Sequence, residues 1–223
     1  IGFQLIKSFL FIFVLICLQG FFGWYMVTSG LVDRVDVSHF RLSVHLVLAF
    51  IILSLILWNY LIFSELKKSN NQISQIFPLI FLFLIFMQII IGAFVAGMDA
   101  GKIYNTWPLM GESFFPDDNI YANIFSISAF SDPSLVQFMH RNLAYIILIT
   151  YLCIFFYIYK KKKYDLYKII NLIGFFLILQ IFLGIITLIN GAQIITSSMH
   201  QISSVFLVSS SIYFIYLNFN QQP

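Results

Sequence analysis

The sequence predicts an all-α fold, a polytopic membrane bundle with six spanning helices, and two observations carry this prediction. Hydrophobic residues make up 61% of the chain and charged residues only 9%, whereas soluble domains average about 45–50% and 25%. Apolar tracts of about 20 residues recur along the chain, each long enough to cross a hydrocarbon core of roughly 30 Å. The tracts lack the short alternating pattern of barrel strands, so helices are the elements expected in lipid.

Six helices are expected in chain order, one for each apolar tract. Polar loops at residues 64–74 and 160–168 separate the second tract from the third and the fourth from the fifth. A much longer loop, residues 99–134, separates the third from the fourth. The expected spans are residues 5–29, 42–63, 75–97, 136–159, 166–189 and 199–218.

Basic residues indicate how the bundle is oriented. Lysines gather in the 64–74 and 160–168 loops and at Lys7, while the opposite face carries most of the acidic residues. By the positive-inside rule the lysine-rich face lies in the cytoplasm, or in the matrix of an organelle. The net charge of +3 is therefore a topology signal and does not indicate a nucleic-acid partner.

Three hairpins repeat along the chain. In the first, third and fifth tracts a Gln precedes a Gly by four residues, and the following tract carries a His at or near its outer start. Gly bares the backbone there, so that a neighbouring helix or a flat ligand can approach closely. The repeating unit is a Gln/Gly helix running outward and a His helix running back. The three sets are Gln19, Gly23 and His45; Gln88, Gly92 and His140; and Gln180, Gly184 and His200.

The repeated histidines are candidate haem ligands. All three are expected at a similar depth near the outer face, and ionisable groups inside a membrane are usually functional. Neutral imidazole is a preferred axial ligand of haem iron, and bundle cores are natural cofactor sites. Two parallel helices could present His140 and His200 to one iron. Zinc is disfavoured because no Cys, Asp or Glu lies beside these residues within the tracts.

Other polar residues are interpreted from their positions alone. His39 lies in the polar stretch VDRVDVSHF and is expected to be a solvated loop residue. Cys17 and Cys153 lie singly in apolar tracts and are expected to be small buried residues. Arg141 has two open interpretations, because its guanidinium could bind a haem propionate or extend to the lipid headgroups.

Five segments, in this order and spacing, resemble the haem A synthases shared by alphaproteobacteria and mitochondria: GWYMVTSGL, RLSVHL, GAFVAGMDAGKIYNTWPLM, VQFMHRNLAY and MHQ. The resemblance covers nearly the whole chain. It implies eight spanning helices in two four-helix halves. Residues 1–64 would be the remainder of the N-terminal half and residues 75–218 a C-terminal four-helix bundle. The implied activity is an oxidoreductase that converts the C8 methyl group of haem O into the formyl group of haem A for terminal cytochrome oxidases.

The resemblance also assigns roles to individual residues. His140 of QFMHR and His200 of MHQ resemble the axial ligands of a haem b in the C-terminal half, with Arg141 beside them at the cofactor. His45 of RLSVHL resembles one of two histidines in the N-terminal half, where the substrate or product haem binds.

The long outer loop is expected to act as a lid over the haem site. Its Tyr104 and Trp107 are unusual in a mere linker, although such residues also form interfacial belts. With the resemblance, Asp99, Asn105 and Trp107 are expected to belong to this lid.

A fourth hairpin is expected upstream of this chain. The family's other N-half histidine lies in an E-x-x-H-R motif, whose Glu is the implied catalytic residue. This motif is absent from the sequence, and three hairpins leave His45 without a partner. The catalytic residues are therefore not assigned within these residues. The cysteine-bearing loops of another family branch are also missing.

Partners and location follow from the resemblance. The cofactor would be haem b, with haem O and haem A as substrate and product, in a bacterial or mitochondrial inner membrane with the haem sites toward its outer face. Candidate partners are the bilayer, an unidentified electron donor or acceptor, haem O synthase, oxidase assembly factors and a second copy of the chain. Two other functions stay open, a dihaem membrane electron carrier and a haem-holding assembly factor for cytochrome oxidase. A carrier usually places its haems at two depths, whereas these candidate ligands share one.

Overall fold

Six long helices make up most of the computed structural model, which describes residues 2–30, 37–64 and 66–219. All six are long and apolar enough to cross a membrane, which confirms the predicted fold class. They are α1 (Phe3–Gly30), α2 (His39–Phe63), α3 (Ile76–Gly97), α4 (Pro133–Lys160), α5 (Tyr167–Ile189) and α6 (Ile194–Asn218).

The starts of two helices differ from the sequence prediction. Helix α4 begins at Pro133 rather than at residue 136, because Asp132 caps it by accepting a hydrogen bond from the Leu135 backbone N–H at 3.0 Å. Proline suits the first helical position, where its missing N–H is not needed. Helix α6 begins at Ile194 rather than at residue 199, so its first turn includes polar residues that hydropathy alone leaves out.

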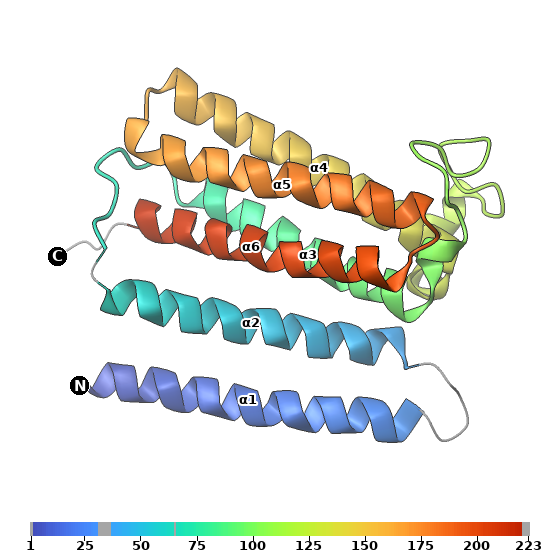
Figure 1. Cartoon of the computed structure of the whole chain (residues 1–223), viewed down its shortest axis with the longest axis horizontal. Coiled ribbons are helices and arrows are strands. Elements are labelled where there is room, and N and C mark those ends of the chain that lie inside the picture. Colours follow the sequence, from blue (N-terminus) through green and yellow to red (C-terminus); the bar gives the residue numbers. More distant parts are fainter. Residues whose placement is uncertain (1, 31–36, 65, 220–223) are drawn as a thin grey trace.

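The helices run side by side, with the connections gathered at two ends (Figure 1). The connection from α2 to α3 and the turn from α4 to α5 lie at one end, together with the start of α1 and the end of α6. The long loop between α3 and α4 and the turn from α5 to α6 lie at the other end. The lysine-rich loops therefore share one end of the bundle, as the charge pattern predicts.

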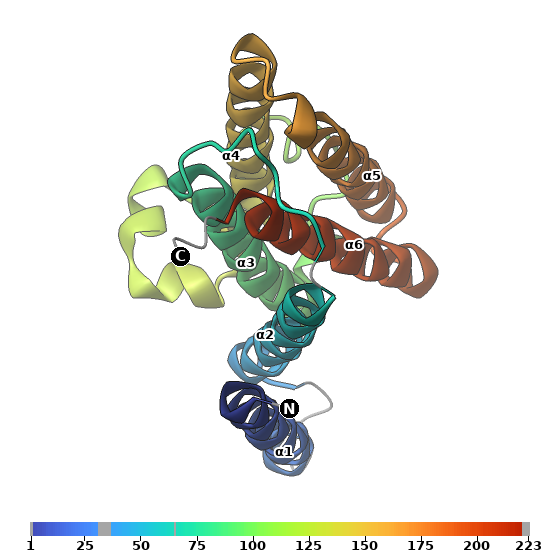
Figure 2. The same cartoon turned by 90° about the vertical axis from the view of Figure 1, so that its left-hand side faces the viewer.

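Helices α3 to α6 form one group, and α2 and α1 extend from it in sequence (Figure 2). Helix α2 packs against α3 and α6, and α1 packs against α2. Half of the most apolar stretch of α6 is buried in the protein, but only 6% of that of α1. Helix α6 is thus the most central helix and α1 the most peripheral.

A continuous apolar core fills the α3 to α6 group and reaches α2. It includes Phe81, Ile158, Ile173, Val208 and Phe214, together with Phe50 of α2. Lipid tails are as apolar as these side chains, so close packing and hydrogen bonds hold membrane helices together rather than the hydrophobic effect. Cys17 and Cys153 are both exposed on this bundle. The expectation that they are buried is therefore wrong, because both lie on outward faces of their helices.

Polar contacts fasten the connection between α2 and α3 onto the end of α6. The buried side chain of Asn218 accepts from the Ile73 backbone N–H at 2.7 Å and donates to its carbonyl at 2.9 Å. The Tyr216 hydroxyl donates to the Leu66 carbonyl, and the Ser69 N–H donates to the Leu217 carbonyl. These bonds fix the end of the bundle opposite the long loop.

Candidate functional site

In all three hairpins the glycine of the outward-running helix lies directly against the imidazole of the returning helix. A Cβ atom added to Gly92 would lie 3.0 Å from Cε1 of His140. The corresponding distance is 3.1 Å both from Gly23 to His45 and from Gly184 to His200. Real Cβ atoms rarely approach other atoms so closely, so each ring occupies space that only glycine leaves free. The structure confirms the predicted hairpin repeat, and it shows that each glycine makes room for an imidazole ring.

The three imidazoles also share one depth. Each histidine lies about two turns after the first residue of α2, α4 or α6, which corresponds to roughly 10 Å along the helix axis. All three helices begin at the end of the bundle that carries the long loop. The rings therefore form one layer near that end, as the sequence predicts.

Glutamine carboxamides contact the rings in the first two hairpins. The Nε2 atom of Gln19 lies 3.2 Å from Nε2 of His45. The Nε2 atom of Gln88 lies 3.2 Å from Nε2 of His140 and also donates to the His140 carbonyl at 3.0 Å. The sequence shows the Gln–Gly spacing, but the role of the Gln as a partner of the ring was not predicted.

In the third hairpin the glutamine carboxamide bonds the backbone of the next helix but not the histidine ring. The Gln180 carboxamide donates to the His200 carbonyl at 3.1 Å, and the His200 ring is bonded by the backbone of Gln180 instead of by its carboxamide. The same residue type at the same repeat position thus has two different environments.

Each of the three rings retains one nitrogen without a protein partner. The Nδ1 atoms of His45, His140 and His200 are buried and form no hydrogen bond within the described residues. Buried polar atoms are almost always paired, so three equivalent exceptions call for an explanation. Neutral imidazole ligates iron through the lone pair of one nitrogen. The glycine surfaces and the unpaired nitrogens therefore fit a haem, which needs only one or two protein ligands.

His140 and His200 come from different hairpins, and they lie on α4 and α6 of the same four-helix group. Among the described residues, no three His, Cys, Asp or Glu side chains gather around a point that could hold a bare metal ion.

Arg141 fastens the long loop to α4. Its Nη1 atom donates to the carbonyls of Thr106 and Leu109 at 2.9 and 3.1 Å, and its Nη2 atom donates to the Tyr104 carbonyl at 2.8 Å. Gln137, one turn earlier, donates to the same Tyr104 carbonyl at 3.0 Å. Both terminal nitrogens of Arg141 are therefore engaged by the loop, a contact that neither sequence interpretation included. Its buried Nε atom has no partner within the described residues.

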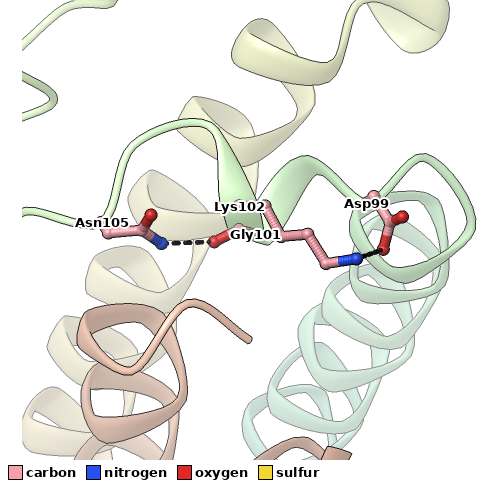
Figure 3. A network of polar contacts seen from close by, with 4 residues as sticks. All are labelled: Asp99, Gly101, Lys102 and Asn105. Atoms are coloured by element: carbon pink, nitrogen blue, oxygen red, sulfur yellow. Dashed lines mark hydrogen bonds and ion pairs between the residues drawn. The ribbon is translucent and has the colours of Figure 1, made fainter. Parts of the chain in front are cut away.

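The long loop is folded, and its contacts join it to two other helices. Asn105 donates from Nδ2 to the Gly101 carbonyl at 2.9 Å (Figure 3) and to the Leu188 carbonyl of α5 at 2.8 Å. A Cβ atom on Gly101 would lie 3.1 Å from the Ala192 Cβ in the turn between α5 and α6. Asn105 thus links the loop to α5, while Arg141 links it to α4 beside His140. This position agrees with a lid, and the contacts of the lid with a ligand remain a prediction.

The other two predicted lid residues are exposed. Asp99 forms an ion pair with Lys102 at 2.9 Å (Figure 3), with both side chains largely in solvent. Exposed pairs of this kind add little stability. Trp107 is 45% exposed. The structure gives neither residue a contact with the three histidines.

Asp118 organises the second half of the loop. It accepts hydrogen bonds from the hydroxyls of Ser134 at 2.6 Å and Tyr104 at 3.0 Å. Burial alone would raise the pKa of Asp118, but the bonds from Ser134, Tyr104 and Asn119 lower it below its ordinary value of 3.8. Burial and the bond to Asp118 raise the pKa of Tyr104. The carboxylate and the phenol group are therefore a stable acceptor and donor at neutral pH.

His39 differs from its sequence interpretation. It is the first residue of α2, and a Cβ atom on Gly97 of α3 would lie 2.8 Å from its Cα atom. Its ring packs edge-on against Phe94, with ring centres 5.3 Å apart. The expectation of a solvated loop residue is wrong, because Gly97 allows the start of α2 to press against α3.

An apolar groove of about 450 Å³ runs between α2 and α6. Its walls begin one residue after His45 on α2 and close to His200 on α6, and they continue for about two turns. The lining residues are Leu46, Ala49, Phe50, Leu53, Ser198, Gln201, Ile202 and Val205. The sequence does not reveal this groove, because the facing of α2 and α6 depends on how the hairpins pack.

Comparison with known proteins gives one family. A family model described as cytochrome oxidase assembly protein matches residues 2–212. A protein of Pelagibacter ubique named heme A synthase is 48% identical over 214 residues, which cover 96% of this chain and 63% of that protein.

Two rickettsial proteins show the same relationship. Proteins named heme A synthase from Rickettsia bellii and Rickettsia prowazekii are 41% and 38% identical over 215 residues. Each alignment covers 92% of this chain and 62% of the relative. The chain thus spans slightly less than two thirds of the length of these relatives.

Proposed function

Because this chain belongs to the family of cytochrome oxidase assembly proteins, we propose that it forms the haem-binding membrane part of a haem A synthase. The proposed reaction oxidises the C8 methyl group of haem O to the formyl group of haem A. One observation carries the proposal: three half-buried imidazoles at one depth, each resting on a glycine and each with a buried Nδ1 atom that is unpaired within the described residues. Relatives named heme A synthase support the substrate class.

His140 and His200 would be the residues that hold the iron of a haem b. They come from α4 and α6 of the α3 to α6 group, and each ring has a buried Nδ1 atom without a partner within the described residues. Residues 75–218 would then be the haem b half of the protein. Arg141 lies next to His140, and its unpaired Nε atom leaves one donor for a propionate while its other nitrogens hold the loop.

His45 would bind the substrate haem, with residues 1–64 contributing to the second half. The groove between α2 and α6 starts beside His45 and is lined mainly by apolar side chains. The farnesyl tail of haem O is apolar and dissolves in lipid, so a groove open to the bilayer can admit it sideways. We propose this groove as the site of the tail.

In this proposal the side chains of the protein bind and orient the haems and shield them from water. Bound haem would supply the redox chemistry needed to attack a strong methyl C–H bond, first to an alcohol and then to an aldehyde. The histidines fix the iron positions, and the glycines let the rings lie flush with the neighbouring helices. The loop held by Arg141 and Asn105 would cover the outer end and limit the access of water. The catalytic group that removes protons is not assigned to any residue of this chain.

The proposed location is a bacterial or mitochondrial inner membrane, with the lysine end in the cytoplasm or matrix and the imidazole layer toward the opposite face. Haem O and the bilayer are the proposed partners. A further protein must accept the electrons, since each of the two oxidation steps removes two. Haem O synthase, oxidase assembly factors and a second copy of the chain are candidates for association.

A dihaem electron carrier and a haem-holding assembly factor are the alternative functions. A carrier would be expected to place haems at two depths, whereas the three imidazoles share one layer. An assembly factor would bind haem and leave its methyl group unchanged.

The decisive experiment is expression in cells that make haem O but no haem A, followed by chromatography of the extracted haems. The complete gene that encodes this chain should yield haem A, and its His45→Ala variant should yield haem b and unmodified haem O without haem A. Recovery of only haem b and unmodified haem O from both would contradict the synthase and favour the alternatives.

A further inference from the structure

We propose that Gln88 is a positioning residue that selects the tautomer of the His140 imidazole and so makes His140 and His200 unequal as axial ligands. The identity of the ligand rests on the proposed function. The rest of the inference comes from the contacts of the repeated glutamines.

The starting observation is a difference between two equivalent positions. Gln88 and Gln180 both donate from Nε2 to the backbone carbonyl of the histidine in the next helix, at 3.0 and 3.1 Å. Of these two carboxamides only that of Gln88 also approaches the ring, with its Nε2 atom 3.2 Å from Nε2 of His140. The carbonyl bond is therefore common to both hairpins, and the ring contact distinguishes them.

A neutral imidazole carries one N–H donor and one lone pair. The nitrogen that binds a metal uses its lone pair, so the other nitrogen carries the proton and normally donates it to an acceptor. In His140 the ring nitrogen that faces the carboxamide is Nε2, while the buried Nδ1 has no partner within the described residues. Gln88 thus faces the nitrogen whose proton decides which tautomer is present.

The orientation of the Gln88 carboxamide decides which tautomer is held. It carries a donor and an acceptor on one planar group, and its Oε1 atom is buried without a partner within the described residues. With the N–H toward Nε2, the imidazole proton resides on Nδ1. With the carboxamide turned, Oε1 accepts a proton carried by Nε2, and the lone pair resides on Nδ1. This state gives up the bond from Gln88 Nε2 to the His140 carbonyl, and it is the state that a metal bound at Nδ1 requires. An apolar side chain of similar size would hold neither state.

A hydrogen bond accepted from the non-ligating N–H strengthens an imidazole as a donor to the metal. A stronger axial donor favours the ferric state and lowers the reduction potential of the haem. The His200 ring is bonded by the backbone of Gln180 and not by its carboxamide, so a change of the Gln180 side chain leaves that bond in place. The potential of a haem b held by both histidines should therefore depend on Gln88 and be far less sensitive to Gln180.

The test compares Gln88→Leu and Gln88→Met with Gln180→Leu and Gln180→Met in the purified full chain. Both pairs remove one carboxamide and one bond to a histidine carbonyl, so they match in packing cost. Haem content, the reduction potential from redox titration, and the g values of the ferric haem are measured. The Gln88 variants should keep haem b, raise its potential and change its g values, whereas the Gln180 variants should shift both much less.

Equal shifts in the two pairs, or no shift in either, would overturn the role of Gln88. If an apolar Gln88 variant loses its haem, Gln88→Glu decides the matter, because it restores an acceptor oxygen at the ring. Recovery of haem in Gln88→Glu supports the ring contact, and failure to recover overturns it. Absence of haem b from the unmodified chain would overturn the proposed function and this assignment together, whereas bound haem b with an unshifted potential overturns this assignment alone.

Discussion

Gly92 and His140 are so close that a Cβ atom on Gly92 would lie 3.0 Å from Cε1 of the imidazole. The ring of α4 therefore rests on the bare backbone of α3. The same relationship recurs from α1 to α2 and from α5 to α6. Because the contact is repeated, we expect the three glycines to have the same role, which is to position an imidazole.

Gly92→Ala should reduce the haem b content of the purified protein several-fold. Alanine favours a helix over glycine by about 0.5–1 kcal/mol, so any loss comes from the imidazole being pushed aside. Haem per polypeptide is measured from the reduced pyridine complex. Gly20→Ala is the matched control, since a Cβ atom there has no neighbour within 4 Å. A full haem complement in Gly92→Ala would contradict the role of Gly92 in seating the His140 imidazole.

His140→Ala and His200→Ala should each abolish the low-spin, bis-imidazole signal in the electron paramagnetic resonance spectrum. Loss of either axial ligand changes the spin state of the iron. His45→Ala should keep this signal, because its ring belongs to a different hairpin and to the proposed substrate site. A normal signal in both His140→Ala and His200→Ala would refute the assignment.

Arg141→Gln should loosen the loop over residues 104–109. The change removes hydrogen bonds to three carbonyls, and bonds from a charged donor are worth about 1.5–3 kcal/mol each. Amide hydrogen exchange of the loop should accelerate at least tenfold, since about 1.4 kcal/mol corresponds to a factor of ten. Lys102→Gln removes another cation from the same loop, but only an exposed pair, and should change exchange little. Equal exchange rates in the two variants would argue against an anchoring role.

Ala49→Phe should block haem A formation while leaving haem b in place. Ala49 lines the groove between α2 and α6, and a phenyl group there would occupy the space proposed for the farnesyl tail. Ile51→Phe places the same phenyl group at an exposed position of α2 that does not line the groove, so it serves as the control. Extracted haems are separated by chromatography. Undiminished haem A in Ala49→Phe would exclude the groove as the site of the tail.

Asn70→Cys and Ile127→Cys should react differently with a membrane-impermeant thiol reagent in intact cells. Asn70 lies in the lysine-rich loop between α2 and α3, and Ile127 lies in the long loop at the other end with 91% of its surface exposed. The positive-inside rule places only Ile127 outside. Cys17 and Cys153 are replaced by Ser in both variants. Labelling of Asn70→Cys from outside would reverse the proposed orientation.

The sequence alone determined the six helices, their order and the three hairpins. Hydropathy and charge act locally, so an apolar tract ends near the same residue whatever its neighbours are. The end of α2 at Phe63 and of α5 at Ile189 therefore match the predicted residues 63 and 189. The spacing of Gln88, Gly92 and His140 identified the candidate ligands for the same reason, because a repeat is visible before anything is folded.

Only the tertiary structure decided what these residues touch. The rotation and depth at which two helices pack depend on the shapes of many side chains at once, and no single tract encodes them. The glutamine amide proved to face the imidazole in two hairpins and only the backbone in the third. Arg141 proved to hold carbonyls of the loop, and His39 proved to lie against Gly97. In each case the partner comes from another helix or from a distant loop, and long-range packing determines that pairing.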